Sequence, residues 1–234
     1  MTIGAATGIP NWKRAAMDAA PVAAGYFTVS WVFGVAALKV GFPLWLPVAM
    51  CMFVYAGASQ FSALTLLAAQ ASVPTIVVTT LLINARHMLM SVYMARALVP
   101  LGLTSRQRWL YGVGLTDESF AIHSTRLARG EIRSGSDLIA FNVTCHLAWI
   151  VGALTGGWCA GAFAHVTHLR LDYALTAMMV YVLVSLCDSR RKLVSAVVAA
   201  GLMLLLKTHA GSAFDVFIAA FAGCGIGICL KKFV

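Results

Sequence analysis

Charge is scarce in this chain of 234 residues. Only 11% of the residues are charged, whereas an ordinary soluble domain carries about 25%. Hydrophobic residues make up 61% of the chain and its mean hydropathy is +0.87. This composition excludes a soluble enzyme, a large domain outside the membrane and a disordered chain, because too little polar material is present to cover a globule. We therefore expect an integral membrane protein with short loops.

Paired cysteines and nucleotide-binding motifs are also missing. The six cysteines lie in or beside apolar segments and none forms a CxxC pair, so no disulfide framework or zinc site is expected. No G-x-x-x-x-G-K-[ST] phosphate loop occurs, which excludes ATP hydrolysis by that route. The net charge of +9 lies mostly between apolar runs, where it sets orientation in the bilayer. We expect no metal, no cofactor and no nucleic-acid partner.

Long apolar runs are what the chain does have. A helix needs about 20 apolar residues to cross the hydrocarbon core of a bilayer, and eight stretches qualify as candidates. They cover residues 18–38, 44–68, 74–97, 106–127, 137–163, 172–188, 191–207 and 211–230. The predicted fold is an all-α, polytopic membrane helical bundle with seven or eight transmembrane segments. We expect it to form a single transmembrane transporter domain over residues 1–234.

Lysine and arginine residues set the predicted orientation. Ten lie on one side of the eight-segment arrangement and six on the other, which favours both termini in the cytoplasm. Arg96, Arg106 and Arg108 then fall on the outer side, against that rule. A broken or re-entrant second or third segment, which would reduce the count to seven, is the alternative. Residues 31–34 resemble residues 149–152, which indicates a faint internal repeat. Chance similarity between two apolar helices is the alternative.

Three charged residues are predicted inside apolar segments: Arg86, Asp117 and Glu118. Each costs on the order of 2.5–3.5 kcal/mol at a helix centre, so we interpret them as parts of a functional site. Asn84 and His87 share one helical face of the third segment, next to Arg86. This polar cluster favours a cavity lining, and a hydrogen-bonding seam between helices is the alternative.

The fourth segment is predicted as one helix, on which Gly114, Asp117 and Ser124 share a small polar face. Glu118 lies beside that face. Two adjacent carboxylates repel each other in a low-dielectric site, and a carboxylate that can exchange a proton is what a proton-coupled carrier needs. A structural ion pair between Arg86 and one of the two acids is the alternative, and both interpretations can hold together.

The second segment contains a run of small and amide residues, Gly57–Phe61. An unwound helix there would free backbone groups to bind an α-carboxylate or α-ammonium group. Close helix packing through small residues is the alternative, and these residues alone favour it. Ser59, with His87 on the next segment, leaves an intramembrane serine hydrolase as a further alternative. No hydrolase motif accompanies the two residues.

Three motifs together resemble the AzlC family: Gly57–Phe61, Asn84–His87 and Leu115–Ala121, in this order and spacing. Members of that family are large subunits of bacterial branched-chain amino-acid exporters. The resemblance implies a multi-pass permease of the bacterial inner membrane that works with a small AzlD-type (YgaH-like) membrane subunit. The implied substrates are L-valine and related amino acids such as leucine, isoleucine or methionine.

The family resemblance and the side-chain chemistry together predict the site. The residues expected to bind substrate are Gly57, Ser59, Gln60, Phe61, Asn84, Arg86, His87, Thr116 and Phe120, and those expected to couple transport to protons are Asp117 and Glu118. Secondary transport, driven by an ion gradient or by substrate efflux, is the expected reaction. A structural subunit that does not itself transport is the last alternative, and the insertion cost of three buried charges argues against it.

Overall fold

The computed structural model describes residues 11–132, 134–161, 180, 183, 187, 189–209 and 215–231. Within these ranges the chain is helical and has no strand, so the predicted all-α fold is confirmed. The chain divides into two compact units, one up to Met179 and one from Val180. The sixth predicted segment, 172–188, lies outside the described residues except at positions 180, 183 and 187.

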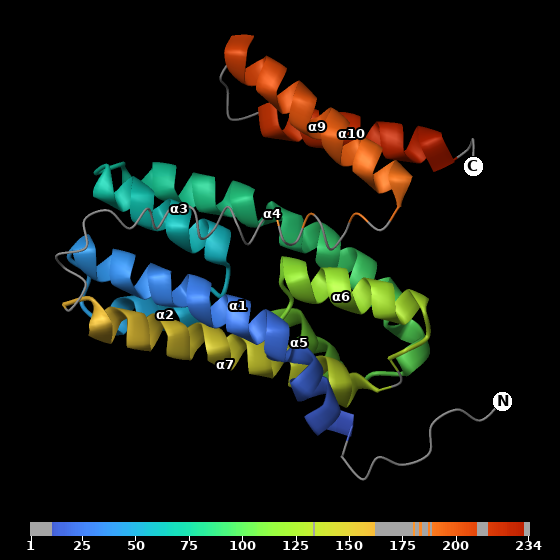
Figure 1. Cartoon of the computed structure of the whole chain (residues 1–234), viewed down its shortest axis with the longest axis horizontal. Coiled ribbons are helices and arrows are strands. Elements are labelled where there is room, and N and C mark those ends of the chain that lie inside the picture. Colours follow the sequence, from blue (N-terminus) through green and yellow to red (C-terminus); the bar gives the residue numbers. More distant parts are fainter. Residues whose placement is uncertain are drawn as a thin grey trace. The chain divides into compact units, whose positions relative to one another are not determined.

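Three helices of the first unit are long and apolar enough to cross a membrane. They are α1 (Asn11–Lys39), α4 (Val73–Ala97) and α7 (Gly135–Cys159), and they correspond to the first, third and fifth predicted segments (Figure 1). The start of α4 shows why the boundaries are predictable. The Ser72 side chain accepts a hydrogen bond from the Thr75 N–H, and Pro74 lies in the first turn, where a missing N–H costs nothing.

Helices α1 and α7 lie side by side and run in the same direction. A Cβ atom added at Gly34 would lie 2.2 Å from the carbonyl oxygen of Ala153, and one at Gly156 would lie 2.0 Å from that of Trp31. Both distances are far below van der Waals contact, so only glycine fits at these positions. Small residues such as Gly152 and Gly156 commonly allow membrane helices to approach this closely.

The second predicted segment is broken, as one of the alternatives allowed. It consists of α2 (Trp45–Phe53) and α3 (Gly57–Ala68). Between them Tyr55 has a φ of 45°, a left-handed conformation that is strained for a bulky side chain. Gly57 also serves close packing, because a Cβ atom there would lie 2.8 Å from Cη2 of Trp149. The segment is therefore both interrupted and closely packed at these small residues, and binding of a substrate group to the freed backbone stays a prediction.

The chain reverses direction at this break. Helix α2 begins just after the end of α1 and runs back along it, so that Tyr55 packs against Tyr26 with the ring centroids 6.2 Å apart. After the break, Phe61 packs against Phe33, further toward the end of α1, with centroids 5.3 Å apart. Helices α2 and α3 thus form a re-entrant hairpin, which we call hairpin 1 (Figure 1).

The prediction of one continuous helix for the fourth segment was wrong. The segment consists of α5 (Ser105–Val113) and α6 (Asp117–Ala128), separated by residues 114–116. The physical reason is a capping box, in which the Thr116 and Ser119 side chains each accept a hydrogen bond from the other's backbone N–H and start a new helix. The polar face expected across Gly114 and Asp117 therefore does not exist as one helical face.

The chain also reverses direction at this second break, but here it enters the bundle from the opposite end. Helix α4 runs from the end of α1 toward the start of α1, and α5 begins there, after the short 3-10 helix η1 (Val99–Leu101). After the break, Glu118 contacts Tyr26, and Arg126 forms a 3.0 Å ion pair with Asp18 near the start of α1. Helices α5 and α6 are therefore a second re-entrant hairpin, called hairpin 2.

The two hairpins and the helices that follow them form two structural repeats. Helices α2, α3 and α4 have 9, 12 and 25 residues, and α5, α6 and α7 have the same three lengths. The repeats enter the bundle from opposite ends, so they are inverted relative to each other. Inverted repeats are common among secondary transporters. This repeat differs from the faint one that the sequence indicated.

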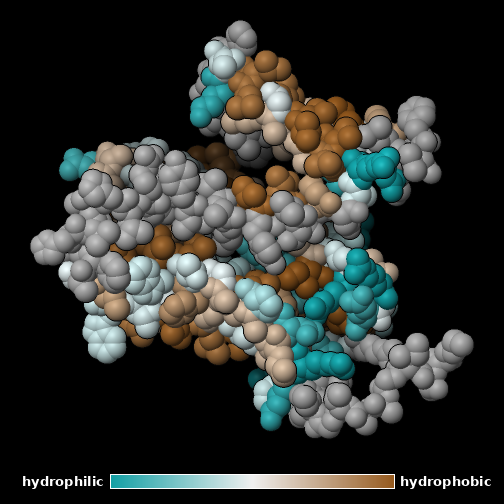
Figure 2. Space-filling model, viewed as in Figure 1, coloured by the Kyte–Doolittle hydropathy of each residue, from teal (hydrophilic) through white to brown (hydrophobic). Residues whose placement is uncertain are grey.

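Many large apolar side chains of the described residues are exposed, and brown areas of Figure 2 mark such surface. On α4 alone, Leu81, Met88 and Leu89 are 66%, 72% and 74% exposed. Surfaces of this kind are stable next to lipid tails and would aggregate in water. Hydrophilic residues gather at the end of the first unit where α1 begins.

The second unit contains α9 (Arg190–His209) and α10 (Asp215–Lys231), which correspond to the last two predicted segments. These helices pack closely, because a Cβ atom at Gly227 would lie 2.6 Å from Oγ of Ser195. The predicted count of seven or eight crossing segments is not confirmed. In the described part of the chain, two of the predicted segments are hairpins and three helices meet the length and composition of a span.

Candidate functional site

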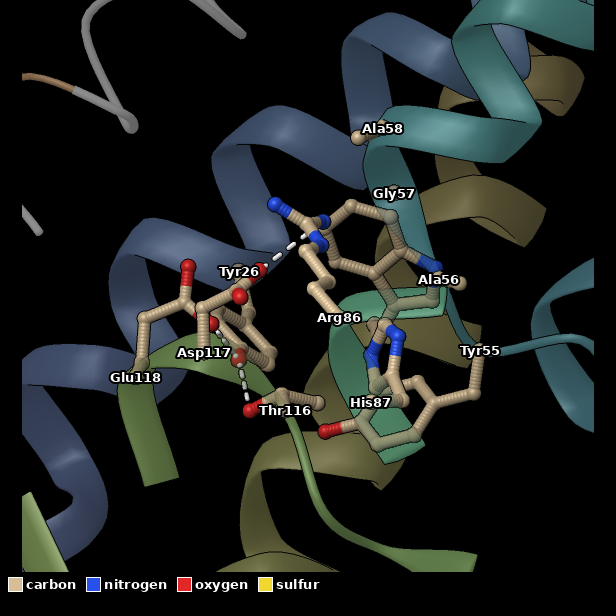
Figure 3. A pocket seen from close by; sticks show the side chains of 11 residues that line it. Tyr26, Tyr55, Ala56, Gly57, Ala58, Arg86, His87, Thr116, Asp117 and Glu118 are labelled. Atoms are coloured by element: carbon tan, nitrogen blue, oxygen red, sulfur yellow. Dashed lines mark hydrogen bonds and ion pairs between the residues drawn. The ribbon is translucent and has the colours of Figure 1, made fainter. Parts of the chain in front are cut away.

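The tips of the two hairpins meet at a pocket inside the first unit (Figure 3). All three long helices contribute to its lining, which consists of Tyr26, Tyr55, Ala56, Gly57, Ala58, Arg86, His87, Thr116, Asp117, Glu118 and Trp149. The cavity volume is about 20 Å³, which is room for about one water molecule. The pocket therefore has no room for an organic ligand until part of its lining moves.

An ion pair joins α4 to the tip of hairpin 2. Nη2 of Arg86 lies 2.9 Å from Oδ2 of Asp117, and the two side chains are 34% and 19% exposed. The predicted ion pair between Arg86 and one of the two acids is thus present. It neutralises Asp117 and leaves Glu118 without a basic partner among the described residues.

Glu118 is buried beside a tyrosine. Only 5% of the residue is exposed, and its Oε2 accepts a hydrogen bond from the Tyr26 hydroxyl. The same hydroxyl oxygen lies 2.6 Å from Oγ1 of Thr116. The hydroxyl links α1 to the tip of hairpin 2 and holds one side of the Glu118 carboxyl group in place.

Three buried polar atoms of lining residues have no hydrogen-bond partner in the described part of the chain: Oε1 of Glu118, the Tyr55 hydroxyl and Nε of Arg86. Buried polar atoms are nearly always paired, because an unpaired one costs about 1–3 kcal/mol. Arg86 can only donate a hydrogen bond, and an ionised Glu118 can only accept one. The set therefore suits a polar ligand that carries both acceptors and donors.

The first turn of α3 points at the pocket without a capping side chain. Ala56 is the residue before the helix and has no side-chain oxygen to accept hydrogen bonds. The N–H groups of Gly57 and Ala58, at the positive end of the helix dipole, are therefore open to an anionic ligand. The tip of hairpin 2 is different, because Thr116 caps it and two acids follow. One tip favours an anion and the other a cation.

Several predicted substrate-binding residues lie behind the first tip. The Ser59 hydroxyl donates to the carbonyl oxygen of Ala56 and accepts a 3.2 Å hydrogen bond from Nδ2 of Asn84. Gln60 is fully buried and accepts a 3.1 Å hydrogen bond from Nε1 of Trp149. None of Ser59, Gln60 and Asn84 lines the pocket. They hold the tip in position against α4 and α7.

The two predicted phenylalanines also lie away from the lining. Phe61 packs against Phe33 as described above, and Phe120 packs against Tyr93 with centroids 5.4 Å apart. His87 does line the pocket, and its Nδ1 lies 3.3 Å from the carbonyl oxygen of Asn84. In the described residues no hydrogen bond joins His87 to Ser59, so the geometry gives no support to a serine hydrolase.

Three aromatic lining residues were not predicted: Tyr26, Tyr55 and Trp149. In an apolar helix an aromatic residue looks like ordinary core, and nothing near Tyr26 or Trp149 in the sequence separates them from it. Tyr55 has a weak signal, because it directly precedes the small residues at which the helix restarts. The edge-on contact of Tyr26 and Trp149, with centroids 5.4 Å apart, depends on the parallel packing of α1 and α7.

Fold and site together define a polytopic membrane protein with a charged pocket between two re-entrant hairpins. Residues 21–163 match the family described as AzlC protein. That range contains every residue that lines the pocket. The chain belongs to the AzlC family.

Named relatives cover most of the chain. The inner membrane protein YgaZ of Escherichia coli (strain K12) is 28% identical over 234 residues, which is 98% of this chain and 92% of the relative. The branched-chain amino acid transport protein AzlC of Bacillus subtilis (strain 168) is 25% identical over 212 residues, 91% of this chain and 82% of the relative. An uncharacterized membrane protein of Helicobacter pylori (strain ATCC 700392 / 26695) is 29% identical over 177 residues, 73% of this chain and 75% of the relative. No solved structure matches the chain.

Proposed function

We propose that this protein is an inner-membrane permease subunit that moves branched-chain amino acids through the pocket at the hairpin tips. The observation that carries the proposal is an unpartnered Nε of Arg86 and an unpartnered Oε1 of Glu118 in one pocket lining. An α-amino acid is a zwitterion and needs one partner of each sign. The Bacillus subtilis relative is named a branched-chain amino acid transport protein, which supports this substrate class.

The substrate carboxylate binds between Arg86 and the start of α3. The guanidinium group has five N–H donors in a planar fork, and Asp117 takes one end of it. The N–H groups of Gly57 and Ala58 add donors from the uncapped helix. Charge-assisted hydrogen bonds of this kind are about twice as strong as neutral ones.

The substrate ammonium binds at the opposite tip. The free carboxylate oxygen of Glu118 and the free hydroxyl of Tyr55 can accept its hydrogen bonds. The apolar walls that remain are Ala56, Ala58 and Trp149, which offer methyl and aromatic surface to a branched side chain. Valine, leucine, isoleucine and methionine meet these requirements, and acidic or basic amino acids would place an unpaired charge against the walls.

Counterflow of labelled L-valine in proteoliposomes that contain this chain together with a small AzlD-type subunit tests the proposal. We expect Arg86→Gln to reduce counterflow at least tenfold, because the carboxylate loses its charged partner. Arg96→Gln is the matched control, since Arg96 lies in the exposed last turn of the same helix and should keep full activity. Equal activity of the two variants would place the amino-acid site elsewhere.

We propose that transport is secondary, exports substrate from the cytoplasm and exchanges protons through Asp117 or Glu118. The ion pair of Asp117 with Arg86 makes Glu118 the acid that is free to take up and release a proton. Glu118→Gln should then abolish any effect of a pH gradient on valine counterflow, whereas Glu131→Gln, in an exposed turn, should not. A pH gradient without effect on the unaltered protein would contradict proton coupling.

A small AzlD-type (YgaH-like) subunit is the proposed partner, as the family resemblance implies. Its contribution is measured by valine and methionine efflux from cells that express this chain with and without the small subunit. We expect efflux only when both are present. Full efflux from the single chain would show that the partner is dispensable.

A further inference from the structure

The basic residues of the first unit gather at one end. Seven of its described lysines and arginines lie there: Lys13, Arg14, Arg96, Arg106, Arg108, Arg126 and Arg129. The opposite end holds Lys39 as the one basic residue among the described positions. Figure 2 shows the hydrophilic residues at the same end. By the positive-inside rule, this end faces the cytoplasm.

The re-entrant hairpins remove the conflict in the eight-segment arrangement. When segments two and four both cross, the residues between α4 and α5 face outward and the link between α3 and α4 faces the cytoplasm. When both are hairpins, each returns to the side that it came from. The link at residues 69–72 then faces outward, and the stretch with Arg96, Arg106 and Arg108 faces the cytoplasm.

The pocket lies at the middle of all three long helices, through Tyr26 of α1, Arg86 of α4 and Trp149 of α7. This places it near the centre of the bilayer. Hairpin 1 reaches it from the outer side and hairpin 2 from the cytoplasmic side. The 20 Å³ cavity between the two tips is too small for an amino acid, so part of the lining moves before a substrate enters, and the two tips are the lining elements that reach the pocket from opposite ends.

We propose that the two hairpins are two gates of opposite sidedness. Movement of hairpin 2 opens the pocket to the cytoplasm, and movement of hairpin 1 opens it to the outside. The substrate's identity as an amino acid rests on the proposed function, but the sidedness of the gates does not. A bound zwitterion has its carboxylate on the tip of hairpin 1 and its ammonium on the tip of hairpin 2, so it links both gates until one opens.

Different contacts hold the two gates closed. The cytoplasmic end of hairpin 2 is tied to α1 by the exposed 3.0 Å ion pair between Arg126 and Asp18. Hairpin 1 is tied to α7 by the buried hydrogen bond between Gln60 and Trp149. Loss of either contact should favour opening on its own side of the membrane.

Cysteine accessibility tests the sidedness without any substrate. Single cysteines are placed in a chain whose six native cysteines have been replaced, and whole cells are treated with a membrane-impermeant maleimide. We expect Ala69→Cys to react in intact cells and Ser105→Cys to react only after permeabilisation. Val40→Cys and Glu131→Cys are controls, because the two arrangements agree on their location. With two hairpins or with eight crossing segments, residue 40 faces outward and residue 131 faces the cytoplasm. The reverse result at residues 69 and 105 would overturn the hairpins, whatever the transported substrate is.

Labelling of Ala58→Cys in the pocket then tests the gating. In sealed vesicles of known orientation, Arg126→Gln should speed labelling from the cytoplasmic side by about 1.4- to 5-fold, the range expected for loss of an exposed ion pair. Gln60→Ala should speed labelling from the outer side instead. An Arg126→Gln variant that changes labelling from the outer side, or equally from both sides, would overturn the assignment of hairpin 2.

Discussion

The contribution of Arg86 to protein stability, through its ion pair with Asp117, can be measured separately from its contribution to substrate binding. The paired atoms are 2.9 Å apart, and the side chains are 34% and 19% exposed. Fully exposed pairs contribute about 0.2–1 kcal/mol, and breaking a fully buried pair costs about 3–5 kcal/mol. For this partly buried pair we expect Arg86→Gln or Asp117→Asn alone to lower the free energy of unfolding by about 2 kcal/mol.

The double variant should lose less stability than the sum of the two single variants. Each single substitution leaves one charge without a partner, whereas Arg86→Gln with Asp117→Asn leaves none. We therefore expect a coupling energy of about 1–2 kcal/mol from the double-mutant cycle. Valine binding should not recover in parallel, because the substrate carboxylate still lacks Arg86.

Equilibrium unfolding in detergent and binding of labelled valine measure the two quantities on the same samples. A loss of 2 kcal/mol is a change of about 30-fold in the unfolding equilibrium, since each 1.4 kcal/mol is a factor of ten. Valine binding by the stable double variant at the unaltered affinity would show that Arg86 is only structural. Strictly additive losses of stability would show that the two side chains do not interact.

Three further substitutions test the packing around the site. Gly57→Ala should weaken valine binding severalfold and lower stability, because the new Cβ atom lies 2.8 Å from Cη2 of the buried Trp149, a lining residue that must shift; binding and unfolding assays check this. Gly156→Ala should lower the unfolding temperature in detergent, because its Cβ atom lies 2.0 Å from a carbonyl oxygen of α1, whereas Gly25→Ala, with nothing within 4 Å, should not. Thr116→Ala should lower the free energy of unfolding by about 1 kcal/mol through loss of the cap of α6, and an unchanged value would contradict the role of that cap.

The long helices were predictable because length and apolarity suffice for them. Helices α1, α4 and α7 each fill a run of 25 residues or more with few charges. The charges inside apolar segments were predictable for the same reason, since Arg86, Asp117 and Glu118 stand out against an apolar background. The structure brings all three together in the lining of one pocket.

The hairpins were harder to predict, because hydropathy shows that a segment is apolar but not whether the chain continues through the bundle or turns back inside it. A helix of 9 residues, a short break and a helix of 12 residues have together the length of one crossing helix. The second break depends on the capping box of Thr116 and Ser119, a local signal inside an otherwise apolar run. The repeat is seen in the lengths of the helices, and these are known only once the two breaks are located.

The polar residues behind the tip of hairpin 1 show a second limit of prediction from sequence. Ser59, Gln60 and Asn84 were expected to bind substrate because of the family resemblance and their polar side chains. In the structure their side chains form hydrogen bonds with Ala56, Trp149 and each other, while Oδ1 of Asn84 has no partner in the described part of the chain. Sequence alone does not separate a residue that binds a ligand from one that supports the site, because the difference lies in the tertiary contacts.

The central claim is that the pocket recognises both ends of an amino acid. Competition for labelled L-valine on the purified protein tests it most directly, with valinol, which lacks the carboxylate, and 3-methylbutyrate, which lacks the amine, as competitors. The structure predicts that unlabelled L-valine displaces the label and that neither analogue does so at a hundredfold higher concentration. Displacement by either analogue as efficiently as by L-valine would contradict a site built around Arg86 and Glu118.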